Sequence, residues 1–235
     1  MEERRAAQHI LKAVAKRARR WIHAVEMGTL RRTQPVSRHW GFDRGTPVDR
    51  YFIEKFLQEN GGSIRGRVLE VKESHYTDRF GTAVQAKDVL DIDAGNPSAT
   101  VVADLAAADS IPSNTFDCFI LTQTLHLIYD LDGAIRHSHR ILRPGGTLLA
   151  TMPALSRIIN GEGIDYDYWR VTGACASRLF GSAFGPENVE VRTYGNVLAG
   201  VAFLVGMAYE ELTKKELEFN DPYFPLLVSV KAVKR

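Results

Sequence analysis

The sequence predicts an α/β domain with a doubly wound, mostly parallel sheet, and three observations support this fold class. Short apolar runs bounded by glycine, proline or asparagine alternate with segments in which apolar residues recur at helical spacing. The short runs are apolar nearly throughout, as in strands that helices cover on both faces. The chain has 235 residues, of which 45% are hydrophobic and 25% charged, so one domain can bury a proper core.

The predicted strands and helices follow one another in the order typical of this class. The first strand, RVLEV, is opened by Gly66, and the helix before it ends at Gly61-Gly62. A later helix leads into the turn Pro144-Gly145-Gly146. We expect strands at residues 67–71, 89–92, 100–103, 116–121, 147–151, 189–194 and 226–233. We expect helices at residues 48–57, 131–142, 174–184 and 196–212, the last so apolar that it forms part of the core or walls a substrate pocket.

The N-terminal segment holds the basic character of the chain. Residues 1–40 contain ten Lys or Arg and three Glu, a charge of +7, which leaves −5 for the remainder of a chain whose net charge is +2. Apolar residues between these charges recur at spacings of three and four. We therefore predict a basic amphipathic helical extension over residues 1–40 and a domain over residues 41–235. The apolar stripe consists of Ile10, Leu11, Val14, Ala15, Ala18, Trp21, Ile22 and Val25.

Three partners suit this amphipathic helix. Its stripe can pack on its own domain or on a twin subunit, it can lie on an anionic membrane surface as a peripheral contact, or its basic face can touch nucleic acid. We favour packing on the domain or in an oligomer. Nucleic acid is disfavoured because no aromatic residues interleave with the basic ones to form a stacking platform.

Polar residues follow the predicted strands at the edge where open α/β sheets bind ligands. Glu70 ends the first strand, and Asp91 and Asp93 lie at the end of the second. Carboxylates at such positions can accept hydrogen bonds from ribose hydroxyls or from an adenine amino group. A single carboxylate at a strand end is more often an ordinary solvated side chain. The prediction of a ligand site therefore depends on polar residues after several strands together. The later strands are followed by Asp104-Leu105 and by Thr122-Gln123.

Four segments together resemble the successive motifs of class I S-adenosylmethionine (SAM)-dependent methyltransferases. These are VLEV (68–71), VVADL (101–105), IPSNTFDCFILTQTLHLIYD (111–130) and HRILRPGGTLLATMP (139–153). The flanking GFDRGTPVDRYFIEKF (41–56) and YGNVLAGVAFL (194–204) resemble a bacterial, methyltransferase type 11-like subgroup found as free-standing chains or beside glycosyltransferases. The resemblance implies a seven-stranded Rossmann-like methyltransferase fold, with helices on both faces of the sheet, that binds SAM.

The resemblance also assigns roles to individual residues. Glu70 corresponds to the acidic residue of the first motif, and Asp91 or Asp93 to the ribose-binding carboxylate. Asp104-Leu105 corresponds to the adenine contact, and Thr122-Gln123 to the loop near the methionine part of SAM.

The chain departs from the family directly after Glu70, where a glycine-rich turn G-x-G-x-G is usual. Lys72, Ser74 and Tyr76 stand at the three glycine positions. Glycine permits positive φ and close backbone approach. Either the loop contributes these side chains to SAM binding, or the site no longer binds SAM. We favour retained binding because the other motifs keep their characteristic residues.

Methyl transfer to oxygen or nitrogen is an in-line displacement in which the protein aligns donor and acceptor and removes a proton. His126, four residues beyond the fourth strand, is the candidate base, although a histidine packed at a helix start is an equal alternative. Tyr166, Tyr168 and Trp169 are candidate substrate contacts, or else a packed cover over the core. Arg44 and Arg50 precede the first strand, where an arginine can pair with the methionine carboxylate of SAM, if neither belongs to an ordinary surface ion pair.

The sequence thus predicts a cytoplasmic SAM-dependent methyltransferase that acts on a small-molecule, natural-product or glycan-like acceptor, most readily at oxygen. No metal site is expected, since Cys118 and Cys175 have no partner at ligand spacing, and no apolar stretch is long enough to cross a membrane. The alternative is a methyltransferase fold that serves as a non-catalytic binding or scaffold module.

Overall fold

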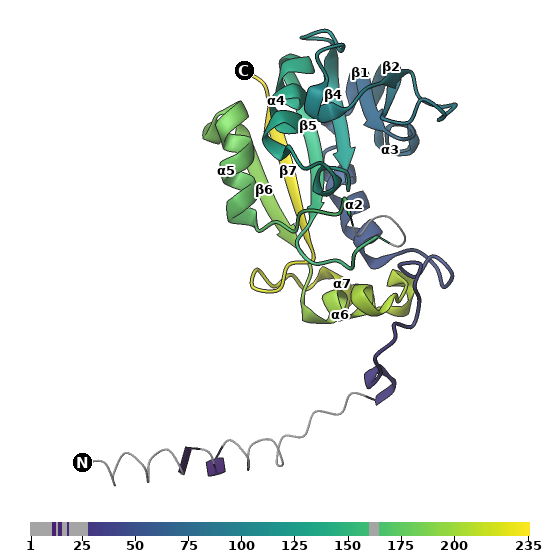
Figure 1. Ribbon diagram of the computed structural model, residues 1–235, viewed down its shortest axis with the longest axis vertical. Coiled ribbons are helices and arrows are strands. Elements are labelled where there is room, and N and C mark those ends of the chain that lie inside the picture. The colour runs from purple at the N-terminus through teal and green to yellow at the C-terminus, as the bar shows by residue number, and fades with distance from the viewer. Residues whose placement is uncertain (1–10, 13, 16–17, 19–27, 160–164) are drawn as a thin grey trace, which may run out of the picture. The chain divides into compact units, whose positions relative to one another are not determined.

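The computed structural model describes residues 11–12, 14–15, 18, 28–159 and 165–235 (Figure 1). The chain divides into two units, residues 1–35 and residues 36–235. In the first unit the five described positions between residues 11 and 18 are helical and exposed, and a 3-10 turn, η1, spans Gly28–Leu30. The rest of the predicted basic helix lies outside the described residues. The boundary between extension and domain at residues 40 and 41 stays a prediction.

The described part of the second unit contains one seven-stranded sheet in the order β3-β2-β1-β4-β5-β7-β6. Neighbouring strands are parallel except that β7 runs antiparallel to both β5 and β6. The predicted doubly wound, mostly parallel fold is therefore confirmed. The strands are β1 (Arg65–Val71), β2 (Ala83–Asp91), β3 (Val101–Val102), β4 (Phe116–Thr122), β5 (Leu142–Pro153), β6 (Val189–Tyr194) and β7 (Leu227–Val233).

Successive side chains of a strand point to opposite faces of the sheet, so a strand that is apolar throughout has two apolar faces. Helices cover both of these faces. In β4, Phe119 and Leu121 join a core cluster with α4 (Leu131–Ile141) and α5 (Gly173–Phe184). Cys118 and Ile120 join a second cluster with α2 (Val48–Glu59) and α6 (Val197–Val205). The short helices are α3 (His75–Phe80), α7 (Lys214–Glu218) and the 3-10 turns η2 (Gly61–Ser63), η3 (Leu105–Ala107), η4 (Leu125–Leu127), η6 (Pro186–Asn188) and η7 (Tyr209–Glu211).

Several predicted elements have other bounds in the structure, among them the strand predicted at residues 89–92, which is β2 and begins at Ala83. The helix predicted over residues 196–212 stops at Val205, because Gly206 adopts φ 79° and Met207 N–H donates to the Ala202 carbonyl at 2.9 Å. This left-handed glycine cap ends a helix in a way that apolar periodicity does not reveal. The turn predicted at Pro144-Gly145-Gly146 lies inside β5, as an irregularity in its pairing with β4.

The helix α3 was not predicted at all. The chain was expected to run as a loop from Lys72 to Tyr76, but His75 and Tyr76 begin a six-residue helix. So short a helix shows too few apolar positions for its periodicity to be recognised. This helix starts three residues after Lys72, at the carboxyl end of β1, and so lies at the edge of the sheet where a ligand is expected.

Candidate functional site

The strand order reverses between β1 and β4, where the chain leaves β1 toward β2 on one side and returns through β4 on the other. Open α/β sheets bind ligands in the crevice beyond the carboxyl ends of strands at such a point. Lys72 directly follows β1 and has φ 70°, and Gln123 directly follows β4 and has φ 46°. Non-glycine residues rarely adopt this left-handed conformation, and they tend to do so at functional sites.

Lys72 has the left-handed backbone conformation that glycine adopts most readily. Its N–H donates to the Leu90 carbonyl at 2.9 Å, and its own carbonyl accepts from Asn96 Nδ2 at 2.8 Å. These two contacts tie the turn after β1 to the end of β2 and to the loop beyond it.

Glu70 anchors the segment that follows this turn. Its carboxylate accepts from Tyr76 N–H at 3.0 Å, from Thr77 N–H at 2.7 Å and from Thr77 Oγ1 at 2.7 Å. Burial raises the pKa of Glu70, and these hydrogen bonds act in the opposite direction. Because its acceptor oxygens face the first N–H groups of α3, Glu70 stabilises the start of that helix.

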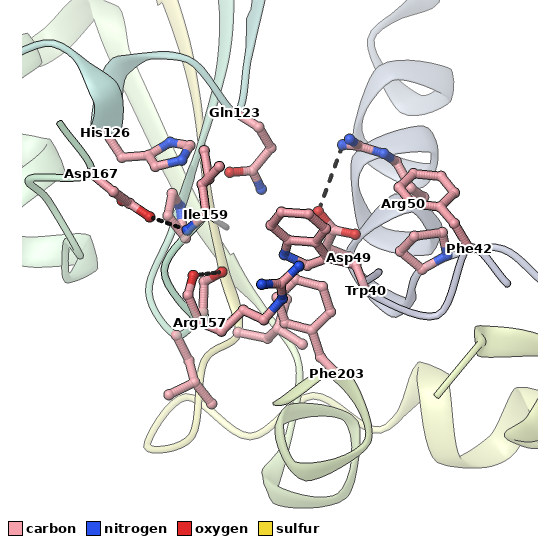
Figure 2. A pocket seen from close by; sticks show the side chains of 15 residues that line it. Trp40, Phe42, Asp49, Arg50, Gln123, His126, Arg157, Ile159, Asp167 and Phe203 are labelled. Atoms are coloured by element: carbon pink, nitrogen blue, oxygen red, sulfur yellow. Dashed lines mark hydrogen bonds and ion pairs between the residues drawn. The ribbon is translucent and has the colours of Figure 1, made fainter. Parts of the chain in front are cut away.

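Two adjoining cavities open at the switch point. The glutamate cavity, of about 470 Å³, is lined by residues that include Glu70, Lys72, Tyr76 and Thr122. The histidine cavity, of about 190 Å³, lies over the ends of β4 and β5, and its walls include His126, Asp49, Trp40 and Phe203 (Figure 2). The two cavities share Phe42, Arg50, Gln123 and Ile159.

His126 is buried in the wall of the histidine cavity. Its ring is 7% exposed, and its Nδ1 has no hydrogen-bond partner among the described residues. The carbonyl of His126 accepts from the N–H groups of Tyr168 and Trp169 at 2.9 and 3.2 Å, so the backbone around the ring is fixed. Burial lowers the pKa of His126 to about 4, against an opposing effect of Asp167. The imidazole is therefore neutral at neutral pH and carries a nitrogen lone pair.

The basic residues before β1 have different surroundings. Arg44 makes two hydrogen bonds to Glu211, at 3.0 and 2.5 Å, as expected of a surface ion pair. Arg50 lines both cavities, with Nη1 3.6 Å from Asp49 Oδ2. Figure 2 shows Arg50 and Asp49 across the histidine cavity from His126. Burial raises the pKa of Asp49, and Arg50 acts against that rise.

The acidic residues after β2 and β3 stabilise their own turns. Asp91 accepts from Asn96 Nδ2 at 2.7 Å and from Asp93 N–H at 3.1 Å. Burial raises the pKa of Asp91, but the hydrogen bonds outweigh it and the net pKa is lowered. Asp104 accepts from Ala106 N–H at 2.9 Å and so begins η3, and Leu105 is buried in the core. These residues lie beyond the walls of the two cavities.

The other predicted contacts also lie apart from the cavities. Ser74 Oγ donates to Asp78 at 3.1 Å, outside both linings. Tyr168 and Trp169 pack against Tyr129, with ring centroids 5.3 and 6.2 Å apart, and Trp169 Nε1 donates to the Ile128 carbonyl at 3.0 Å. Tyr166 is exposed and is also absent from the described cavity walls. Thus Glu70, Lys72, Tyr76, Thr122, Gln123 and His126 are brought together, and Ser74, Asp91, Asp104, Leu105, Tyr166, Tyr168 and Trp169 are not.

Trp40 and Arg157 are among the residues of the histidine cavity that the sequence did not single out, whereas Phe203 belongs to the helix that was expected to form part of the core or to wall a pocket. The guanidinium carbon of Arg157 lies 3.4 Å from the centre of the Trp40 ring, and Arg157 Nη2 donates to the Arg38 carbonyl at 2.6 Å. Phe203 enters from α6, which therefore belongs both to the core and to a pocket wall. A lone tryptophan in the glycine-rich stretch before α2 was the one available signal for Trp40.

The described residues include no group of three or more His, Cys, Asp or Glu side chains that could hold a metal ion. Within the same ranges, we find no helix with the length and apolar character needed to span a membrane.

Residues 63–150 match a family described as a methyltransferase domain. The ubiquinone/menaquinone biosynthesis C-methyltransferase UbiE of Pasteurella multocida is 41% identical over 61 residues, which cover 23% of this chain and 23% of that protein. UbiE of Escherichia coli (strain K12 / DH10B) is 46% identical over 44 residues, covering 19% and 18% of the two chains. The chain therefore matches less than a quarter of the length of these relatives.

Solved structures extend the likeness to most of the fold. An S-adenosylmethionine-dependent methyltransferase from Mesorhizobium loti has a TM-score of 0.52 at 14% identity, covering 83% of this chain and all of that one. The [4+2]-cyclase SpnF has a TM-score of 0.51 at 17% identity, covering 81% and 83% of the two chains. At such identities the likeness concerns the fold alone.

Proposed function

We propose that this chain, which belongs to the class I SAM-dependent methyltransferases, transfers a methyl group to a hydroxyl oxygen of a small-molecule, natural-product or glycan-like acceptor. The observation that carries the proposal is His126, a buried neutral imidazole with an unpartnered nitrogen, in a cavity that adjoins the carboxyl ends of β1 and β4. A site of this kind suits a proton acceptor placed beside a cofactor.

The residues of the glutamate cavity fit the methionine end of SAM. Lys72 has a left-handed backbone conformation and, with Tyr76 and Thr122, lines a space of about 470 Å³. Arg50 faces that space and supplies a cation for the methionine carboxylate. Side chains thus take part at positions where the family usually presents bare backbone.

The adenosine end would extend toward β2 and β3, where Asp91 binds the ribose and Asp104 with Leu105 contacts the adenine. A carboxylate accepts about four hydrogen bonds. The bonds that Asp91 and Asp104 make within their own turns therefore leave acceptor capacity for a ligand.

The acceptor would occupy the histidine cavity, between Trp40 and Phe203 on its apolar side and His126 on its polar side. When bound, SAM would supply an electrophilic methyl group to the acceptor oxygen in line with the breaking carbon–sulfur bond, and would leave as S-adenosylhomocysteine. His126 takes the hydroxyl proton, and Arg50 and Gln123 lie where the two cavities meet and can fix both reactants.

Methyl transfer to carbon is the second candidate, because the relatives named UbiE are C-methyltransferases. An acceptor carbon activated by a neighbouring hydroxyl would need the same proton acceptor. Transfer from methyl-¹³C SAM to a panel of phenols and sugars, read by NMR of the product, separates an O-methyl from a C-methyl group.

The non-catalytic alternative is tested by calorimetric titration with S-adenosylhomocysteine. We expect binding that Arg50→Met weakens about 10-fold or more through the lost charge-assisted contact. Arg44→Met is the matched control, since Arg44 pairs with Glu211. If the native protein binds neither SAM nor S-adenosylhomocysteine at millimolar concentration, the methyltransferase proposal is wrong.

A further inference from the structure

The helix α6 is apolar on every side but is not buried on every side. Its sequence VLAGVAFLV contains no charged or polar side chain. Its inner face, with Ala202 and Phe203, packs in the core, whereas its outer face is exposed to solvent. The exposed fractions on this outer face are 57% for Val197, 42% for Leu198, 37% for Val201 and 37% for Leu204. A helix that is hydrophobic all round normally has a partner on every side.

The outer face of α6 is continuous with the histidine cavity. At 3.6 residues per turn, Gly200 lies around the helix between Phe203, which lines the cavity, and Leu204, which lies on the outer face. Leu155 lines the cavity, is itself 37% exposed, and lies against Gly200, where an added methyl group would be 3.0 Å from Leu155 Cδ2. Gly200 is itself buried beneath Leu155, so the exposed side of Leu155 is what joins the cavity to the outer face of the helix.

The apolar path from the cavity across Leu155 extends along the whole helix, over about 13 Å for nine residues. At its start, Asn196 Nδ2 donates to the Phe219 carbonyl at 2.7 Å, so the exposed ring of Phe219 belongs to a residue held beside the first turn. The polar groups His126 and Gln123 lie at the cavity end of this path, and only apolar side chains lie along α6.

We propose that the acceptor is an amphiphile, whose reacting polar group enters the histidine cavity and whose hydrocarbon chain lies across Leu155 and the outer face of α6. This inference rests on the proposed function for the reacting group alone. The chain-binding site depends on the continuity of the apolar surface with the cavity. Leu155 is the specificity-determining position, because its side chain lines the cavity and is also exposed beside α6.

The test measures affinity for straight-chain alcohols from hexanol to decanol by calorimetry, in the presence of excess S-adenosylhomocysteine. Each added methylene buries apolar surface, so we expect the dissociation constant to fall at least 10-fold over the series. In Leu155→Gln and in Val201→Gln/Leu204→Gln we expect the whole series to vary by less than threefold. Val102→Gln is the control, since Val102 is equally exposed but lies on β3.

Chain-length dependence that is absent in the native protein, or that survives in both variants, overturns the proposal. Two other outcomes also overturn it. Binding to phosphatidylglycerol vesicles without any dependence on alcohol length would assign the face to a membrane surface. A dimer in sedimentation equilibrium that Val201→Gln/Leu204→Gln dissociates would assign it to a second copy. Failure to bind S-adenosylhomocysteine with the alcohol series intact would instead break the proposed methyl transfer and leave the chain site standing.

Discussion

The loops after β1 and β4 start alike and then differ. Each begins with a non-glycine residue in the left-handed region, Lys72 in one and Gln123 in the other. In the loop after β1, the buried polar groups are satisfied internally, since Glu70 accepts three hydrogen bonds from the start of α3. In the loop after β4, His126 is buried with an unpartnered Nδ1.

The difference separates a loop whose buried carboxylate is fully hydrogen-bonded from a loop whose buried imidazole is not. A buried polar atom without a partner costs stability, so it persists where a ligand or a reaction uses it. The loop after β1 has no such atom at Glu70, because its carboxylate accepts three hydrogen bonds from within the loop. We therefore expect substitutions after β1 to change stability and substitutions after β4 to change catalysis.

The largest expected effect is that of His126→Asn on turnover. Removal of a general base lowers kcat by about 10²- to 10⁴-fold. The affinity for S-adenosylhomocysteine should stay within about twofold, because His126 lies in the histidine cavity and not in the glutamate cavity. His137→Asn, on α4, is the control and should keep full activity. An unchanged kcat in His126→Asn would remove the distinction between the two loops.

Glu70→Ala tests the loop after β1. The change leaves the Tyr76 and Thr77 N–H groups without their acceptor, and we expect the free energy of unfolding to fall by about 2–4 kcal/mol. Glu70→Gln keeps the shape and one acceptor oxygen, so it should cost roughly half as much. Urea unfolding measures both, with exposed Glu73→Ala as a control that should stay within about 0.5 kcal/mol. A cost for Glu70→Ala as small as that of the control contradicts the anchoring role.

The pH dependence of stability tests the burial of His126. The folded state lowers its pKa from 6.5 to about 4, so the unfolded chain takes up this proton first as the pH falls. The contribution of His126 to the free energy of unfolding is fully present above pH 6.5. It falls by about 3 kcal/mol as the pH falls toward 4. His126→Asn should lose less stability than the native protein over this interval. Parallel curves for the two proteins would mean that the imidazole is not desolvated.

The sequence predicts the fold well because each signal is local and repeated. The apolar runs of β1 and β4 and the periodicity of α2 and α4 identify the buried elements, and the motifs place Glu70 and Thr122-Gln123 at the strand ends. The parallel order of the strands then brings these residues to one edge. The acceptor side is less accessible to such reasoning, because Trp40, Arg157 and Phe203 come from distant segments that meet only in the folded chain.

The aromatic segment shows the same limit. The aromatic composition predicts that Tyr168 and Trp169 contact a ligand. The direction of their side chains, however, depends on the hydrogen bonds that hold the backbone of the segment. Their N–H groups donate to the His126 carbonyl, and their rings pack on Tyr129. Their observed part is to fix the backbone of the histidine, and a role in substrate binding stays a prediction.

The smallest expected effect concerns Lys72, where glycine should be preferred to alanine. In most strand and helix positions alanine is the more stable by about 0.5–1 kcal/mol, because glycine loses more entropy on folding. At φ 70° a Cβ costs roughly 1–2 kcal/mol, so the order should reverse. We expect the free energy of unfolding of Lys72→Gly to be higher than that of Lys72→Ala by about 0.5–1 kcal/mol. The pair Lys87→Gly and Lys87→Ala in β2 provides the ordinary order, and both lose the same contact to Asp78. If the alanine variant is the more stable at both positions, the turn after β1 does not need a left-handed residue at Lys72. The two loops of the switch point then have less in common than their backbone angles indicate.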